Sequence, residues 1–154
     1  DSTYKLYLID YSGVAPVTDS VHLQCKFSSD GGTTFHAGMG SGLRQYNGES
    51  AGTEAIGMNG SAGAVQGGTF TLITDCGNDA DMGQCGQIWI SNPASTSLTK
   101  MFRATNVGHH SSDLCWTSWI DGYVNTTTAI DSIQFLMASG NIAKGSFRIY
   151  GVTV

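Results

Sequence analysis

Residues 129–152, AIDSIQFLMASGNIAKGSFRIYGV, decide the fold that the sequence predicts. Every second residue from Ile133 to Met137 is apolar, and Phe147 and Ile149 resume the alternation after a Ser-Gly-Asn turn signal. A period of two residues is typical of β-strands, because successive side chains in a strand point to opposite faces. The stretch therefore predicts two strands joined by a short connector.

The same period recurs along the rest of the chain, and no window shows the 3.6-residue period of an amphipathic helix. A Ser-Asp-Gly-Gly-Thr turn signal at 29–33 predicts a tight turn, with a return strand beginning at residues 34–35. We predict an all-β protein, an antiparallel β-sandwich with jelly-roll-like connections. The strands are expected at 4–11, 21–27, 43–46, 54–58, 69–74, 87–91, 99–105, 114–120, 132–137 and 146–153.

A chain of 154 residues is long enough for one domain. We expect a single β-sandwich domain over 1–154, with an exposed glycine-rich loop at 57–68. Because the first expected strand begins almost at the first residue, we interpret the chain as the C-terminal fragment of a longer protein.

The composition is poor in charge, with 12% charged residues where soluble domains usually have about 25%. Such a surface is expected to be covered by neighbouring subunits or to meet neutral partners. The net charge is −5 and no Lys/Arg cluster is present, which argues against nucleic-acid binding. No apolar run approaches about 18 residues, so we expect no membrane insertion.

The four cysteines do not have the spacing of a metal-binding knuckle. Cys76 and Cys85 flank a polar loop and are candidates for a disulfide. An even number of cysteines only permits pairing, so free thiols are the alternative. Cys25 falls on the apolar side of its expected strand, where a buried thiol is expected.

Catalytic and metal sites find little support in the sequence. The carboxylates lie mostly in turns, and no facing pair of the kind that a glycosidase needs can be identified. His109 and His110 are neighbours and would point to opposite faces of a strand. Asp79 and Asp81 lie in a loop whose Asp-x-Asp-x-Gly spacing is weakly similar to a calcium loop, and a solvated turn between two strands is the simpler alternative. We expect no cofactor other than calcium at these two residues.

Aromatic residues are the main candidates for a binding surface. Such side chains stack on sugar rings and also dominate protein interfaces. We predict glycan-binding or interface roles for four of them, and a glycan site would use Asp79 and Asp81 beside the two tryptophans. The four are Trp89, Trp119, Tyr123 and Tyr150. Tyr4, Tyr7 and Phe147 are further candidates for the core or an interface.

Several segments, in order along the chain, resemble the C-terminal domain of tailed-bacteriophage virion proteins, especially tail-fibre and capsid-associated proteins of marine phages. The segments are PVTD at 16–19, FSSDGGTTF at 27–35, GQIWISNPAST at 86–96, GYVNTTTAI at 122–130 and the SGNIAKGSFRIYG ending at 139–151. The cysteines and LCWTSW at 114–119 do not belong to the pattern.

The resemblance implies a structural or adhesive β-sandwich domain of a virion, without catalytic residues. It places the domain in an extracellular particle made in the host cytoplasm, as part of a tail fibre, capsid fibre or decoration protein. A homotrimer in contact with other virion proteins is the expected assembly. The alternative is a glycan-binding module that recognises the host surface.

Overall fold

The structure, a computed structural model, describes residues 3–48, 54–58 and 68–153. In these ranges it contains ten β-strands and no helix, which confirms the all-β prediction. No helix that is long and apolar enough to cross a membrane occurs in the described ranges. The strands are β1 (Leu6–Pro16), β2 (Val21–Ser28), β3 (Gly38–Gly48), β4 (Glu54–Met58), β5 (Phe70–Cys76), β6 (Gln84–Ser91), β7 (Lys100–His110), β8 (Leu114–Val124), β9 (Ser132–Met137) and β10 (Ile142–Val152).

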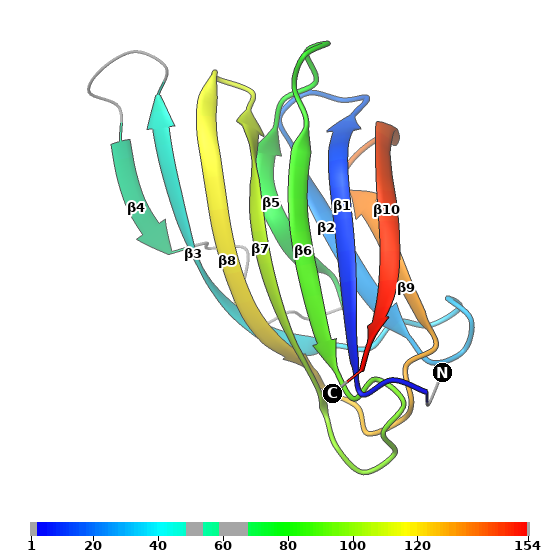
Figure 1. The fold of residues 1–154 in the computed structure, drawn as a ribbon. Helices are drawn as coiled ribbons and strands as arrows, with labels where there is room; N and C mark the ends of the chain where they lie inside the picture. The colour runs from blue at the N-terminus through cyan, green and yellow to red at the C-terminus, as the bar shows by residue number, and fades with distance from the viewer. Residues whose placement is uncertain (1–2, 49–53, 59–67, 154) are drawn as a thin grey trace.

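The strands form two layers that pack face to face (Figure 1). The front layer has the order β4-β3-β8-β7-β6-β1-β10, and each neighbouring pair is antiparallel. The back layer has the order β5-β2-β9 and is also antiparallel. A pairing between Cys76 of β5 and His110 of β7 joins the two layers. The sheet does not close into a barrel, so the fold is an open β-sandwich.

The strand pairing follows a nested order. β1 pairs with β10, β2 with β9 and β3 with β8, so the first strands pair with the last ones. Nested pairing of this kind is typical of a jelly roll. β4 departs from the order because it pairs with β3, and β7 lies between β6 and β8. The predicted jelly-roll-like sandwich is confirmed, with a front layer widened by these two strands.

The hydrophobic core lies between the layers and follows from the alternation in the sequence. Along β2, Val21, Leu23, Cys25 and Phe27 are buried and the residues between them are partly exposed. The ring of Phe27 lies 5.6 Å from that of Phe70 and 5.5 Å from that of Phe102, centroid to centroid. The rings therefore meet in the contact range of aromatic pairs and join the layers.

Glycine residues explain why β3 is longer than the predicted strand at 43–46. A Cβ atom on Gly38 would lie 2.1 Å from the carbonyl oxygen of Tyr123 and 2.6 Å from the ring of Phe70. Only glycine permits this approach, which lets β3 pair with β8 from Gly38 to Gly48. A glycine-rich segment is a weak strand signal in the sequence, although here it is needed for the pairing.

Two expectations about the connections need correction. The return strand predicted at residues 34–35 is wrong: Phe35 makes a single bridge to Ser28, and the chain then crosses to the front layer as β3. The strand predicted from residue 146 begins at Ile142, where β10 pairs with Pro16. β9 and β10 lie in different layers, so the turn at 139–141 connects the layers. Of the predicted loop at 57–68, residues 59–67 lie outside the described residues.

Candidate functional site

The outer face of the front layer is defined by the register of its strands. Residues directly opposite each other on paired strands share a face of the sheet. The register places Tyr150, Leu8, Trp89, Arg103 and Asp121 in one row across five neighbouring strands. The alternate residues of β6 and β7 are buried in the core, so this row points away from it.

Exposed apolar side chains gather on this outer face. The back layer presents polar residues outward, among them Gln24, Lys26 and Gln134, as is usual for the solvent side of an antiparallel sheet. The front layer is different: of the ten large apolar side chains that are exposed in the described residues, seven lie on its outer face. They are Met39, Leu43, Ile56, Met101, Val107, Trp119 and Tyr150.

The structure brings the four aromatic candidates together on the outer face. Trp89 and Tyr150 share the row described above. Trp119 lies opposite Thr105 of β7, and Tyr123 lies opposite Met101. Since residues two apart along β7 share a face, both side chains point outward with Arg103. The four residues were selected by residue type. The order and register of the strands, which residue type does not reveal, place them on one surface.

The other aromatic candidates lie elsewhere. Phe147 is partly buried and packs against the core, with its ring centroid 4.3 Å from that of Phe135 and 5.8 Å from that of Tyr11. The rings of Tyr4 and Tyr7 meet edge to face at 5.8 Å. These residues therefore stabilise the fold around β1 and β10, at one side of the front layer.

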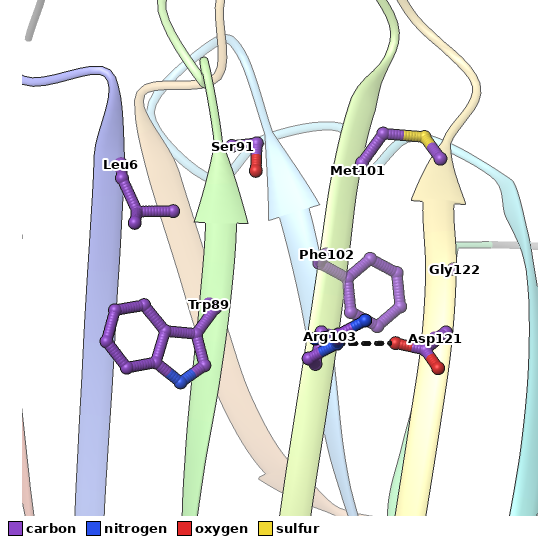
Figure 2. A pocket seen from close by; sticks show the side chains of 8 residues that line it. All are labelled: Leu6, Trp89, Ser91, Met101, Phe102, Arg103, Asp121 and Gly122. Atoms are coloured by element: carbon purple, nitrogen blue, oxygen red, sulfur yellow. Dashed lines mark hydrogen bonds and ion pairs between the residues drawn. The ribbon is translucent and has the colours of Figure 1, made fainter. Parts of the chain in front are cut away.

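A hollow of about 570 Å³ opens on the outer face (Figure 2). The indole of Trp89 is on one side of it, and Arg103 and Asp121 are on the other (Figure 2). Arg103 Nε donates a hydrogen bond to Asp121 Oδ1 at 3.1 Å, and the two side chains are 73% and 65% exposed. The hollow is lined by Leu6, Trp89, Ser91, Met101, Phe102, Arg103, Asp121 and Gly122. An aromatic ring and a neutral ion pair thus face the same opening.

A second region of the outer face, which we name the apolar patch, consists of Leu43, Ile56, Val107 and Trp119. Leu43 lies directly opposite Trp119, while Val107 and Ile56 lie in the next row of the sheet. The four side chains are between 41% and 72% exposed. They span β7, β8, β3 and β4, whereas the hollow spans β1, β6, β7 and β8.

The predicted calcium ligands are not joined by a third acidic, His or Cys side chain in the described residues. Asp79 and Asp81 are exposed in the turn after β5, and neither lines the hollow. Hydrogen bonds hold the loop, with Asn78 Nδ2 donating to the Val17 carbonyl at 3.0 Å and Lys144 Nζ to the Ala80 carbonyl at 2.6 Å. In the described part of the chain no group of three or more His, Cys, Asp or Glu side chains is placed to hold a metal ion.

The candidate disulfide between Cys76 and Cys85 is not formed, and the structure has the alternative, free thiols. Cys76 is buried in the core and Cys85 is exposed on the outer face of β6, and both are free thiols. The alternation of β6 explains the difference, because Gln84 faces inward and its neighbour must face outward. Burial raises the pKa of the Cys76 thiol to about 12, which suppresses its reactive thiolate form.

His109 and His110 point to opposite faces of β7, as expected for neighbours on a strand. His109 is exposed on the outer face. His110 stacks on Trp116 at 4.7 Å between ring centroids, and its Nε2 lies 3.9 Å from Asp75 Oδ2. The pair cannot act on a common ligand.

Sequence reasoning missed the Arg103–Asp121 pair, which forms one side of the hollow. A signal for it exists in the sequence. β7 and β8 are joined by the turn at 111–113, so His110 lies opposite Leu114. Counting from this pair, back along β7 and forward along β8, places Arg103 opposite Asp121. The hairpin register could therefore have found the pair.

Comparisons with known proteins add no assignment, since no family model, no curated protein and no solved structure matches the chain.

Proposed function

We propose that this protein is a structural or adhesive β-sandwich domain that acts by surface contact and carries out no reaction. The observation that supports the proposal is the concentration of exposed apolar side chains on the outer face of the front layer. Large exposed apolar patches on soluble proteins mark interaction sites. The resemblance to virion proteins of tailed bacteriophages agrees with this role and suggests a tail fibre, capsid fibre or decoration protein.

We propose a further copy of the chain as the partner of the apolar patch. Charges are few on the described part of the outer face: Arg103 pairs with Asp121, Arg148 lies opposite Asp10, and Glu54 of β4 is a further exposed carboxylate. Two such faces carry little net charge and repel each other weakly, and burial of their apolar side chains is favourable. The resemblance suggests an oligomer, and we propose a trimer as the assembly.

Catalysis has no place in the proposal because three hollows formed by the described residues each contain one carboxylate. The hollow on the outer face contains Asp121 as its one carboxylate. The cleft beside β10 contains Asp131, and the depression near β6 contains Asp81. Hydrolysis of a glycoside by the usual mechanism needs two carboxyl groups about 5–10 Å apart.

The assembly can be tested with two leucines that differ mainly in position. Leu43 is 48% exposed in the apolar patch, and Leu98 is 56% exposed in the loop after β6. Light scattering after size exclusion is expected to show a mass of three chains for the unaltered protein. Leu43→Gln should raise the concentration at which half the chains are assembled by at least about tenfold. Leu98→Gln should leave it unchanged.

The outcomes separate clearly. A monomer at all concentrations would refute assembly through the apolar patch. Equal effects of the two leucine substitutions would show that general surface hydrophobicity, and not this patch, causes the association.

A further inference from the structure

We infer that the hollow on the outer face is a binding site for a neutral saccharide ring. This inference rests on the proposed adhesive role of the outer face and names the class of ligand that the face would take. It requires that the hollow stays open while the apolar patch is covered. The two regions share β7 and β8 but no side chain.

The first argument is the aromatic side of the hollow. The Trp89 indole is partly exposed and lies beside Leu6 of β1, and Figure 2 shows its ring face on. The C–H groups of a pyranose present a flat apolar surface that packs on such a ring. A side chain held on a strand in the middle of a sheet provides a platform with a fixed position.

The second argument is the polar side of the hollow. The bond between Arg103 and Asp121 uses one of the five guanidinium N–H donors and one of the two carboxylate oxygens. Both side chains are largely exposed, so donors and acceptors remain for a ligand. Two neighbouring hydroxyl groups of a sugar can accept a hydrogen bond from the Arg103 guanidinium and donate one to the Asp121 carboxylate. Ser91 adds a hydroxyl group to the lining.

The third argument is charge. Arg103 and Asp121 are the two charged residues of the lining, and each neutralises the other. An anionic ligand such as a phosphate or a uronate would gain little net attraction here. A purely apolar ligand would remove the water that contacts the ion pair and would supply no hydrogen bonds in its place. A neutral polyhydroxylated ring avoids both costs, and a volume of about 570 Å³ is in the range of ligand sites.

The test uses four probes, the methyl glycosides of glucose, galactose, mannose and N-acetylglucosamine, with ¹⁵N-labelled protein in NMR titrations. At least one glycoside should give saturable shifts of the Trp89 indole N–H and of the amides of Arg103 and Asp121. Trp89→Ala should weaken binding roughly tenfold. Trp119→Ala, which removes an exposed indole from the apolar patch, should leave saccharide binding unchanged.

A second variant tests the charge argument without removing the ring. Asp121→Asn keeps the shape of the side chain and leaves Arg103 unpaired, so the hollow gains a positive charge. Methyl glucuronide should then bind at least about tenfold better than to the unaltered protein. The amide spectrum of each variant checks its folding.

The inference is overturned if none of the four glycosides gives saturable shifts, or if Trp89→Ala and Trp119→Ala have equal effects. Light scattering on the same samples keeps the two proposals apart. If the protein assembles but binds no saccharide, only the saccharide site is refuted. If it is a monomer that binds saccharide, only the assembly is refuted.

Discussion

Asp30 organises the turn that follows β2. Its Oδ1 accepts hydrogen bonds from Ser28 Oγ at 2.7 Å and from the backbone N–H of Thr34 at 2.9 Å, while Thr34 Oγ1 donates to Oδ2 at 2.5 Å. Hydrogen bonds to the carboxylate favour its charged form. The Thr34 side chain, then the Thr34 backbone, then Ser28 hold the pKa of Asp30 well below its usual value.

This lowered pKa predicts a pH dependence of stability. Because the pKa is lower in the folded state, the contribution is fully present above the unfolded-state pKa of about 3.9. It is lost as the pH falls from there through the folded-state pKa. Asp30→Asn should therefore lower the urea midpoint at neutral pH, and the difference from the unaltered protein should shrink below about pH 4.

Urea unfolding at a series of pH values measures this difference. Thr34→Val, which removes the hydroxyl donor, should give a smaller effect of the same sign. Parallel curves for Asp30→Asn and the unaltered protein from neutral pH to about pH 2 would contradict the assignment.

At the same scale, a buried polar network shows what alternation cannot predict. The Tyr11 hydroxyl donates to Asn106 Oδ1 at 2.5 Å, and Asn106 Nδ2 donates to the Leu72 carbonyl at 2.9 Å. Ser118 Oγ donates to the same carbonyl at 2.5 Å. The period-two pattern indicates which strand positions face inward, but these groups come from β1, β5, β7 and β8. Their meeting depends on strand order, which local sequence does not encode.

For the elements, the existence of strands was more predictable than their partners. The alternation at 132–137 and 146–153 correctly predicted β9 and most of β10. It did not show that β9 pairs with β2 while β10 pairs with β1. The candidate site has the same limit. Residue type selected Trp89 and Trp119, but the register of β6, β7 and β8 determines that Arg103 and Asp121 accompany Trp89.

Lys100 connects the loops at one end of β7 and β8. Its side chain is fully buried, and Nζ donates to the carbonyls of Ser95 at 2.6 Å, Leu98 at 2.7 Å and Thr127 at 3.0 Å. Burial lowers the pKa of this amine because it disfavours the charged form. The three carbonyls compensate the ammonium group with hydrogen bonds, and the lysine in turn satisfies the carbonyls.

We predict that Lys100→Met lowers the free energy of unfolding by about 3 kcal/mol, because the carbonyls lose their donor inside the protein. Urea unfolding monitored by tryptophan fluorescence measures the change. Lys144→Met is the matched control, since Lys144 is exposed and donates to one carbonyl, that of Ala80. The control should change stability by less than about 1 kcal/mol. Equal effects of the two substitutions would show that Lys100 does not link the loops.

For the whole molecule, the outer faces of the two layers have different chemistry. An antiparallel sandwich usually presents polar residues on both outer faces, so that each sheet is apolar on one side only. Here the back layer follows that pattern and the front layer does not. The low charge content of the chain, 12%, agrees with a surface that is partly removed from water by contact with neighbours.

This difference predicts the thermodynamics of association, independently of the number of subunits. If apolar side chains such as Leu43, Ile56 and Trp119 drive assembly, then association should strengthen on warming from about 5 to about 25 °C, because hydrophobic stabilisation weakens on cooling. The heat-capacity change on association should be negative. Sodium sulfate should strengthen assembly. Calorimetric dilution at several temperatures measures these quantities.

An electrostatic interface would behave in the opposite way. Association through unlike charges weakens as sodium chloride screens them over a Debye length of about 10 Å at 0.1 M. The described part of the outer face carries two pairs, Arg103 beside Asp121 and Arg148 opposite Asp10. Glu54 is a further carboxylate, so the net charge available to attract a second copy is small. We therefore expect dissociation constants that do not rise with sodium chloride. A steep rise would mean that charged residues outside the outer face hold the assembly together.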